Sequence, residues 1–516
     1  MTDPGHFTEL DQFEIDPRSV RLLDEEFCRR RQVVVLGVVG RGEGAQERDE
    51  PVTVGMVEAG RRSRVAEVEQ RLGREVRPVQ LNAFEVRRAL DKGWGLGDPA
   101  LDPAVITLRP VRDISFRGGG ARGLTVPELV AEILGHAVHL GASDVHIESY
   151  GHDVDVRLRV DGVLRQVATP LSKENVQEAI ARLKVLADLD IAERRRAQDG
   201  RIRASWRDGK GDGDGRPIDF RLSIVPGPGG EDAVLRILDR ATAVLGLEEL
   251  GFAGDNLTTF ERLITNPEGM VLVTGPTGSG KTTTLYAAIH RINSAENKIL
   301  TAENPIEYRF PKTNQKQVSP TMGFADYARA FLRQNPDVIL LGEVRDEETA
   351  DAAIRAAQTG HLVLSTLHTN DAVRTISRLQ TLGVAGGMIA SCLLGALSQR
   401  LVRRICAECT EAAPPTAQEA SRLGLDAGET FHRGAGCEAC EGRGTRGRTG
   451  IYELFVLDSD LADRVAAGAP VHELRKVALE RGMKTLLDDA LEKARAGVIP
   501  LSEVLRAVPY RMIEGR

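Results

Sequence analysis

The chain has 516 residues and a formal net charge of −7, from 68 lysines and arginines against 75 aspartates and glutamates. This mild acidity and an aromatic content of 4% argue against a nucleic-acid-binding protein, which needs a basic surface or a platform for stacked bases. No apolar stretch approaches the ~18 residues that a membrane-spanning helix needs, and the start of the sequence has no signal-peptide pattern. We therefore expect a cytoplasmic protein that contacts a membrane only through partners.

Residues 1–95 are predicted to form a small N-terminal α/β domain. Runs of β-branched residues at 33–39 and 52–57 predict two paired strands, and residues 61–72 have the apolar spacing of a helix. No pattern in this segment indicates catalysis, so we interpret it as a docking domain.

Residues 96–124 are predicted to form a flexible linker. They contain Pro99, Pro103 and Pro110, followed by a run rich in glycine and arginine. Such a composition buries too little apolar surface to offset the entropy lost on ordering.

Residues 125–240 are predicted to form a second domain of mixed helices and strands. The alternation of apolar and polar residues indicates strands, and apolar residues at helical spacing indicate helices. The expected elements are a helix at 127–140, strands at 145–148 and 153–160, a helix near 173–189 and a strand pair around the turn at 226–230.

Arginines are concentrated in this second domain. Most of them are expected to form a solvated face that pairs with acidic neighbours. The alternative is that a few bind nucleotide phosphate, because the guanidinium group binds phosphate oxygens in a bidentate manner. The candidates are Arg157, Arg159, Arg194, Arg195, Arg196, Arg201, Arg221 and Arg236.

The motif Gly-x4-Gly-Lys-Thr at 275–282 matches the phosphate-binding loop of P-loop NTPases. An apolar run at 270–274 predicts a strand before it, and a helical pattern follows it. Glycines let the backbone N–H groups form a nest for anionic oxygens, and the helix N-terminus adds positive potential. We expect Lys281 to reach the β- and γ-phosphates of ATP and the Thr282 hydroxyl to hold Mg²⁺. The predicted nucleotide-binding residues are Gly275, Pro276, Thr277, Gly278, Ser279, Gly280, Lys281, Thr282 and Thr283.

Residues 241–402 are predicted to form an ATPase domain around this loop. Apolar strands are expected at 298–303, 337–343 and 361–368. Strands that alternate with helices are typical of a parallel sheet covered on both faces. Ligands of such sheets lie beyond the carboxyl ends of the strands, so side chains at these ends should converge on the loop.

Three of these strands end in side chains suited to ATP hydrolysis. Glu343 is predicted to help hold Mg²⁺, and Glu303 to polarise the attacking water, with Glu307 as the alternative. Glu303 could instead be a helix cap or a surface acid. His368, or else His361, is a candidate sensor of the γ-phosphate, although a histidine in an apolar run is often structural.

The six cysteines include two Cys-x2-Cys pairs. Four thiolates in two such pairs predict a closed tetrahedral zinc site with a structural role. Iron is the alternative metal, and a redox pair is a third possibility. We expect Cys28 and Cys392 to be small buried apolar residues. The predicted zinc ligands are Cys406, Cys409, Cys437 and Cys440, in a zinc-binding subdomain at 403–450 that precedes amphipathic helices at 451–516.

Several motifs, some of them already described, resemble those of a known family. They lie at 141–148, 157–162, 198–201, 275–282, 301–307, 337–343, 359–371 and 447–453, together with the two Cys-x2-Cys pairs. In these motifs the chain resembles the ATPases of type II secretion and type IV pilus assembly, over roughly residues 125–510 and more weakly over 10–95.

The resemblance implies a RecA-like P-loop NTPase domain with a parallel sheet, preceded by a PAS-like α+β domain and the small N-terminal α/β domain. It also implies a ring-shaped homohexamer in which Arg221 and Arg236 complete the ATP site and the domains swing about a hinge near Ala241. Such motors drive a platform at the cytoplasmic side of the inner membrane. The four cysteines favour the extension or secretion branch, because retraction motors lack them.

Two positions depart from the family pattern. Asn304 stands where the family has an aspartate, and Ala197 where it has a proline. Our leading hypothesis is an ATP-hydrolysing motor. The alternatives are a RecA-like DNA-translocating motor and, because of Asn304, a regulatory protein that binds ATP without hydrolysing it. The motifs are shared by the secretion and pilus branches and do not distinguish them.

Overall fold

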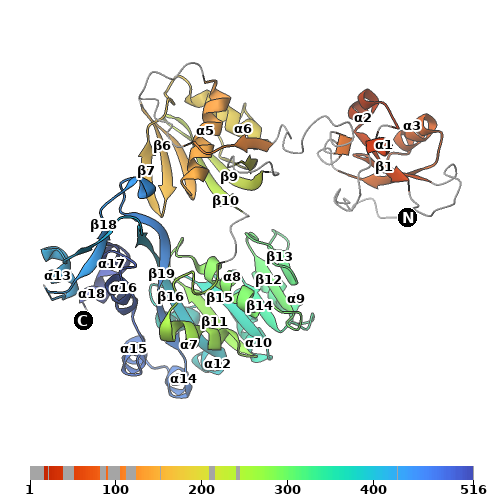
Figure 1. The fold of residues 1–516 in the computed structure, drawn as a ribbon. Helices are drawn as coiled ribbons and strands as arrows, with labels where there is room; N and C mark the ends of the chain where they lie inside the picture. The colour runs from red at the N-terminus through yellow and green to blue at the C-terminus, as the bar shows by residue number, and fades with distance from the viewer. Residues whose placement is uncertain are drawn as a thin grey trace. The chain divides into compact units, whose positions relative to one another are not determined.

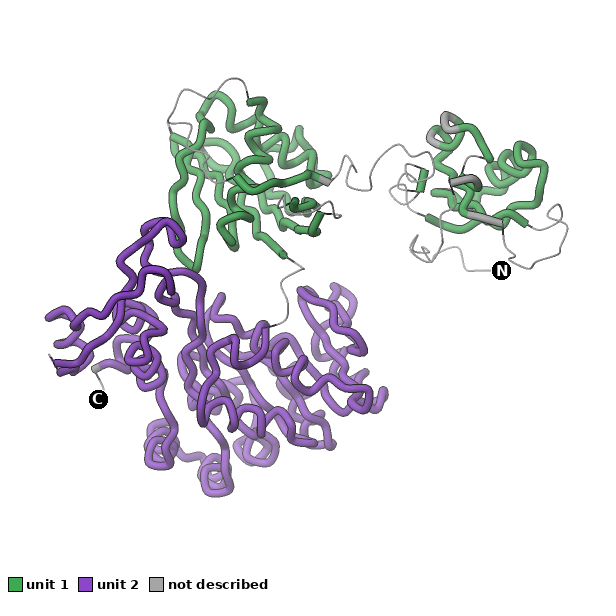
Figure 2. The backbone as a smooth tube through the Cα atoms, in the orientation of Figure 1, with its two compact units in different colours: residues 1–241 green, residues 242–516 purple. Residues whose placement is uncertain are grey.

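The computed structural model describes residues 17–20, 22–38, 51–81, 86, 89–90, 105–111, 124–151, 153–207, 215–239, 245–426 and 428–514. The chain forms two compact units, residues 1–241 and 242–516, drawn green and purple in Figure 2. Among the described residues, every helix is too short or too polar to span a bilayer. The hinge predicted near Ala241 lies outside the described residues.

The N-terminal part of unit 1 is a small α/β fold around a three-stranded sheet of order β1-β2-β3. β1 and β2 pair, as predicted, and do so antiparallel, while β2 pairs in parallel with β3. Valines of β1 and β2 are buried together with Phe27 and Leu81, which gives this part its own core. The elements are α1 (Pro17–Val20), α2 (Glu25–Arg31), β1 (Val33–Val38), β2 (Val52–Met56), α3 (Arg62–Leu72) and β3 (Val76–Gln80).

The second part of unit 1 is a seven-stranded sheet with two helices packed against its apolar face (Figure 1). The strand order is β4-β8-β9-β10-β5-β6-β7, and all pairs are antiparallel except the parallel pair β4–β8. The elements are β4 (Val105–Leu108), α5 (Val126–His139), β5 (Asp144–Tyr150), β6 (Asp153–Val160), β7 (Val163–Val167), α6 (Val176–Leu186), β8 (Gln198–Trp206), β9 (Arg216–Gly227) and β10 (Gly230–Asp239).

Strand β4 lies inside the segment 96–124, for which the sequence predicts a linker. Ile106 and Leu108 are buried, and β4 extends the edge of the sheet next to β8. The strand was not predicted because it is short and the neighbouring prolines and glycines dominate the composition of the segment. Residues 96–104 and 112–123 lie outside the described residues.

Unit 2 is built on a second seven-stranded sheet of order β13-β12-β14-β15-β11-β16-β19. The first six strands are parallel, which confirms the predicted parallel sheet, and β19 is antiparallel to β16. The strands are β11 (Gly269–Thr274), β12 (Ile299–Glu303), β13 (Thr313–Gln317), β14 (Val338–Leu341), β15 (Leu362–Leu367), β16 (Leu393–Ile405) and β19 (Thr445–Val456).

Helices cover both faces of this sheet, as predicted. One apolar cluster joins one face to α7 (Gly254–Ile264) and α8 (Lys281–Ile292). A second cluster joins the other face to α9 (Phe324–Phe331), α10 (Glu347–Gln358), α11 (Arg374–Thr381) and α12 (Gly386–Cys392). The carboxyl ends of the six parallel strands therefore share one edge, and the candidate site residues follow four of these strands.

The long pair β16–β19 crosses two of the predicted domain boundaries, at 402 and 450. Between these strands lie β17 (Thr410–Ala413), α13 (Ala417–Leu423), β18 (Phe431–Gly434) and the short 3₁₀ helix Glu438–Cys440. β19 extends to Val456, so the start of the predicted helical tail is a strand; its aromatic and β-branched residues fit a sheet. The helices that follow are α14 (Ser459–Ala466), α15 (Val471–Glu480), α16 (Leu486–Arg495), α17 (Leu501–Ala507) and α18 (Tyr510–Glu514).

Candidate active site

The glycine-rich loop lies between β11 and α8, in the strand–loop–helix context that the motif requires. The φ angles of Gly275, Gly278 and Gly280 are 143°, 76° and 89°. Side chains disfavour this region of φ, so glycine is needed at all three positions. The helix that follows directs its N-terminal N–H groups toward the loop, which favours an anionic ligand.

Strand β16 braces the loop from the neighbouring position in the sheet. The Gln399 side chain donates from Nε2 to the Ser279 carbonyl oxygen at 2.6 Å. A Cβ atom on Gly275 would lie 2.5 Å from the Gln399 carbonyl oxygen. The backbone of the loop is thus held close to β16, and no larger residue fits at position 275.

The other loop residues differ in exposure. Ser279 is buried, whereas the side chains of Pro276 and Thr277 are exposed. Thr282 and Thr283 are exposed in the first turn of α8. Their hydroxyl groups are therefore accessible to a ligand at the N-terminus of the helix.

Lys281 folds back over the loop. Its Nζ donates to the carbonyl oxygens of Gly275 at 3.0 Å and Pro276 at 3.1 Å. Burial lowers the pKa of Lys281; the negative charge of Glu343 opposes this shift, and the positive charge of Arg400 adds to it. Phosphate oxygens would replace the two carbonyl oxygens as hydrogen-bond acceptors. Their negative charge would also stabilise the positive charge of the ammonium group.

Glu343 and His368 lie together with Lys281 at the carboxyl edge of the sheet. The Glu343 Oε2 atom is 2.6 Å from Arg345 Nε and 3.9 Å from His368 Nε2. Burial lowers the pKa of His368, and the positive charge of Lys281 adds to this shift although Glu343 opposes it. The imidazole is therefore neutral at neutral pH and can both donate and accept hydrogen bonds.

His361 lies at the opposite end of β15 from His368. Its Nδ1 atom is 2.9 Å from the Ala356 carbonyl oxygen and 3.1 Å from Thr359 Oγ1, at the end of α10. Because β15 rises by about 3.3 Å per residue, its two ends are roughly 20 Å apart. These contacts indicate a structural role, as the alternative interpretation of a histidine in an apolar run expects.

Glu303, at the end of β12, is enclosed by hydrogen-bond donors. Its side chain is buried and accepts hydrogen bonds from the hydroxyl groups of Tyr286 and Thr301 and, at 3.0 Å, from Gln315 Nε2. Both carboxylate oxygens are engaged by protein groups. This environment fits a fixed structural carboxylate better than one that activates water.

Glu307 has the opposite environment. Its side chain is exposed, while its backbone N–H donates to the Tyr286 hydroxyl oxygen at 3.1 Å. Asn304, between the two glutamates, is also exposed. Tyr286 was missed by the sequence analysis, because a tyrosine in an apolar helix gives no functional signal until its hydroxyl partners are known.

Arg400, on β16, is a second residue that the sequence analysis missed. Its Nη2 donates to the Asn370 carbonyl oxygen at 3.2 Å, which joins β16 to the loop after β15. Burial lowers the pKa of Arg400, and the charges of Glu453 and Asp371 oppose this shift. The arginine adds positive charge near Lys281, but nothing in the sequence distinguishes it from its arginine neighbours.

In unit 1, four arginines and one aspartate form a row across five adjacent strands. The ladder places Arg201 opposite Arg221, Arg221 opposite Arg236, Arg236 opposite Asp144, and Asp144 opposite Arg159. Asp144 pairs with Arg236 at 3.3 Å and with Arg159 at 3.6 Å. Like charges directly opposite each other destabilise a sheet, so this row favours an anionic ligand.

The other four candidate arginines lie outside this row. Arg157 pairs with Glu148. Arg194, Arg195 and Arg196 are exposed in the segment before β8. These four fit the solvated basic face expected for most arginines of this region.

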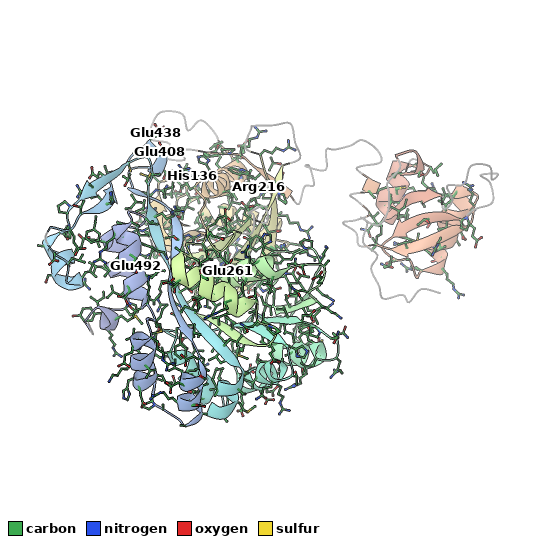
Figure 3. All side chains as sticks on the ribbon, turned by 60° about the horizontal axis from the view of Figure 1, so that its bottom comes forward. His136, Arg216, Glu261, Glu408, Glu438 and Glu492 are labelled. Carbon is green, nitrogen blue, oxygen red and sulfur yellow. The ribbon has the colours of Figure 1, made fainter. Side chains whose placement is uncertain are left out.

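The four cysteines of the two Cys-x2-Cys pairs form one cluster. Their sulfur atoms all lie within 4.8 Å of one another, and three pairs are 3.7–3.9 Å apart. A regular tetrahedron with Zn–S bonds of about 2.3 Å has sulfur–sulfur edges of roughly 3.8 Å, so the cluster fits zinc. Figure 3 labels Glu408 and Glu438, which lie within the two pairs. Cys28 and Cys392 are buried, as expected.

Two family models match the chain. The model described as type II/IV secretion system protein matches residues 122–506, and the MshEN domain matches residues 6–92. The first covers the second part of unit 1 from α5 onward and nearly all of unit 2, and the second covers the three-stranded sheet.

Curated relatives match with high identity. The type II secretion system ATPase E of Vibrio cholerae is 45% identical over 73% of this chain and 74% of its own length. The type IV pilus assembly ATPase PilB of Myxococcus xanthus is 37% identical over 96% of this chain and 88% of its own length. PilB of Thermus thermophilus is 44% identical over 73% of this chain, which spans only 42% of that relative.

A solved structure shares the fold. The ATPase DotB of Legionella pneumophila aligns over 80% of this chain and 100% of its own chain, with a TM-score of 0.56 and 23% identity.

Proposed function

The chain belongs to the type II/IV secretion system protein family, and from this premise we propose that it is an ATP-hydrolysing motor for type II protein secretion or type IV pilus assembly. The convergence of Lys281, Glu343 and His368 at one edge of the parallel sheet carries the proposal. A loop that merely binds phosphate needs only its glycines and lysine. The added carboxylate and neutral imidazole supply groups that hydrolysis needs.

Each group at this edge has a role in the proposed reaction. The loop amides and Lys281 bind and neutralise the β- and γ-phosphates of ATP. Thr282 and Glu343 would hold Mg²⁺, which supplies charge neutralisation at the phosphates. His368, which is neutral and half-exposed, can contact the γ-phosphate and respond to its loss.

We assign the orientation of the attacking water to Glu307 and not to Glu303. Glu303 already accepts three hydrogen bonds from protein groups and is buried. Glu307 follows in the same segment and keeps its carboxylate exposed. A general base must be within reach of the water, and an exposed carboxylate meets that condition more readily.

The arginine row of unit 1 supports the assignment of Arg221 and Arg236 to phosphate binding. Three arginines directly opposite one another on a sheet are stabilised when an anion spreads its charge among them. Arg201 is partly neutralised by Asp219 at 2.8 Å and Arg236 by Asp144. Arg221 lies at the centre of this trio.

Membership of the family supports a proposal for the wider assembly. We propose a homohexamer at the cytoplasmic side of the inner membrane, held there by platform proteins of the secretion or pilus machinery. The domain at 1–95 serves for docking, and zinc bound by the four cysteines has a structural role. The proposed domain limits are those of the sequence analysis, apart from strand β4 within the linker and the pair β16–β19, which crosses the limits at 402 and 450.

Phosphate release from ATP by the purified protein tests the function. The wild type should hydrolyse ATP in the presence of Mg²⁺, and Lys281→Ala should reduce kcat by at least about 100-fold, because losing one charge-stabilising group costs about 3–4 kcal/mol of barrier. Lys476→Ala, at an exposed site in α15, is the matched control and should leave turnover unchanged. Full activity of Lys281→Ala would refute the site. A wild type that binds ATP but releases no phosphate would favour the non-hydrolysing alternative.

A further inference from the structure

Tyr286 joins the P-loop helix to the segment that carries both glutamates. It lies in α8, five residues after Lys281, and its side chain is buried. Its hydroxyl group donates to the Glu303 carboxylate and accepts the backbone N–H of Glu307 at 3.1 Å. One oxygen atom thus fixes the end of β12 and the backbone of Glu307 to α8.

The surroundings of Tyr286 hold this oxygen in place. The ring packs edge-to-face against Phe310, at 5.1 Å between centroids, and against Tyr308, at 5.7 Å. Gln315 donates from Nε2 to Glu303 at 3.0 Å and to the Tyr308 carbonyl oxygen at 2.8 Å. Burial raises the pKa of the Tyr286 hydroxyl, and Glu303 adds to this shift, so the group remains a donor.

We infer that Tyr286 is a positioning residue for hydrolysis: it sets the place of the Glu307 carboxylate relative to phosphates bound at the start of α8. The inference rests on the proposed function and deepens it. In the proposed function, Lys281 and Thr282 would hold phosphate oxygens, and both lie on the same helix as Tyr286. Glu307 follows the end of β12, three strands away from β11 in the sheet. Through its hydroxyl group, Tyr286 connects the helix to the backbone N–H of this glutamate.

This geometry explains why a tyrosine and not a phenylalanine occupies the site. Phenylalanine would make the same aromatic contacts and leave the core filled. Glu303 would lose one donor, and the Glu307 N–H would lose its acceptor. A reacting group displaced by about 1 Å can cost roughly 100-fold in rate. The expected defect is therefore in the chemical step and not in nucleotide binding.

Steady-state phosphate release by full-length Tyr286→Phe tests the inference. We expect kcat to fall about 10- to 100-fold while KM for ATP changes less than about 2-fold. Tyr327→Phe is the matched control, because its hydroxyl donates to the Gln317 carbonyl oxygen at 3.2 Å, outside this network; its kcat should equal that of the wild type. A wild-type kcat for Tyr286→Phe, or a rise in KM at unchanged kcat, would overturn the inference.

A double mutant separates positioning from loss of fold. If Tyr286 acts through Glu307, then Tyr286→Phe combined with Glu307→Gln should be no slower than Glu307→Gln alone. Rate losses that multiply would overturn the inference. The proposed function fails separately, if Lys281→Ala keeps full activity. If Tyr286→Phe has the wild-type rate while Lys281→Ala is inactive, the positioning role of Tyr286 is wrong but the proposed function stands.

Discussion

Two glutamates only four positions apart have opposite surroundings at the residue scale. Glu303 is buried and accepts hydrogen bonds from Tyr286, Thr301 and Gln315, whereas Glu307 is exposed. A buried carboxylate with several donors stabilises the fold, whereas an exposed carboxylate is accessible to water. Substitutions of the two residues should therefore have different effects, one on turnover and the other on stability.

We expect Glu307→Gln to lower kcat by about 100-fold or more with normal stability, because general-base catalysis contributes about 10²–10⁴-fold. Glu303→Gln should instead reduce the free energy of unfolding by about 1–3 kcal/mol, since an amide cannot accept from all three donors. Phosphate release and urea denaturation of both variants measure this. The reverse pattern, with normal turnover in Glu307→Gln and a stable but inactive Glu303→Gln, would restore Glu303 as the group that activates water.

The sequence identifies those site residues that follow a recognisable strand or motif. Glu343 and His368 were predicted because each ends an apolar run, and parallel strands bring such ends to one edge. Tyr286 and Arg400 could not be predicted in the same way. Each acts through a hydrogen bond to a segment distant in sequence, and a side chain's partners are visible only in the folded protein.

At the scale of elements, a strand could be predicted from the sequence when its residues are mostly apolar. The strands β11, β14 and β15 are buried throughout and mostly apolar, and they were predicted. β13, a strand at the edge of the sheet, reads Thr-Asn-Gln-Lys-Gln and has only partly buried or exposed side chains, so its sequence resembles a loop. β16 and β19 extend from the sheet to the cysteine cluster. Their pairing over this length could not be predicted, because the two strands are distant in sequence and neither contains a pattern that identifies its partner.

The cysteine cluster provides a prediction at this scale. The wild type should contain about one zinc ion per chain, and Cys437→Ser should lose the zinc and lower the melting temperature, because metal binding at a structural site contributes folding free energy. Metal content by mass spectrometry and thermal unfolding measure both effects. Cys392→Ala, at a buried cysteine outside the cluster, should keep its zinc. Iron in place of zinc, or an unchanged melting temperature in zinc-free Cys437→Ser, would contradict the assignment.

At the scale of the whole molecule, the chain divides into two compact units, one with the arginine row and the other with the P-loop. If both contribute to a motor that works as a homohexamer, ATP turnover per chain should depend on assembly. We expect specific activity to rise with protein concentration in parallel with the hexamer population. Analytical ultracentrifugation and phosphate release over the same concentrations measure this. Constant turnover per chain where the protein is monomeric would contradict a requirement for assembly.

The pairing of Ile405 with Thr445 at the far end of β16 and β19 has a consequence for protein engineering. Because paired strands lie about 5 Å apart, the chain leaves the sheet and returns to it at nearly the same point. The segment 406–444 is therefore an excursion whose length is not constrained by the strands that surround the P-loop. A short turn, or a foreign domain with closely spaced termini, could replace it without changing the strand order around the P-loop, provided that it also covers the apolar surface of the C-terminal helices against which Leu423, Leu425 and Phe431 are buried.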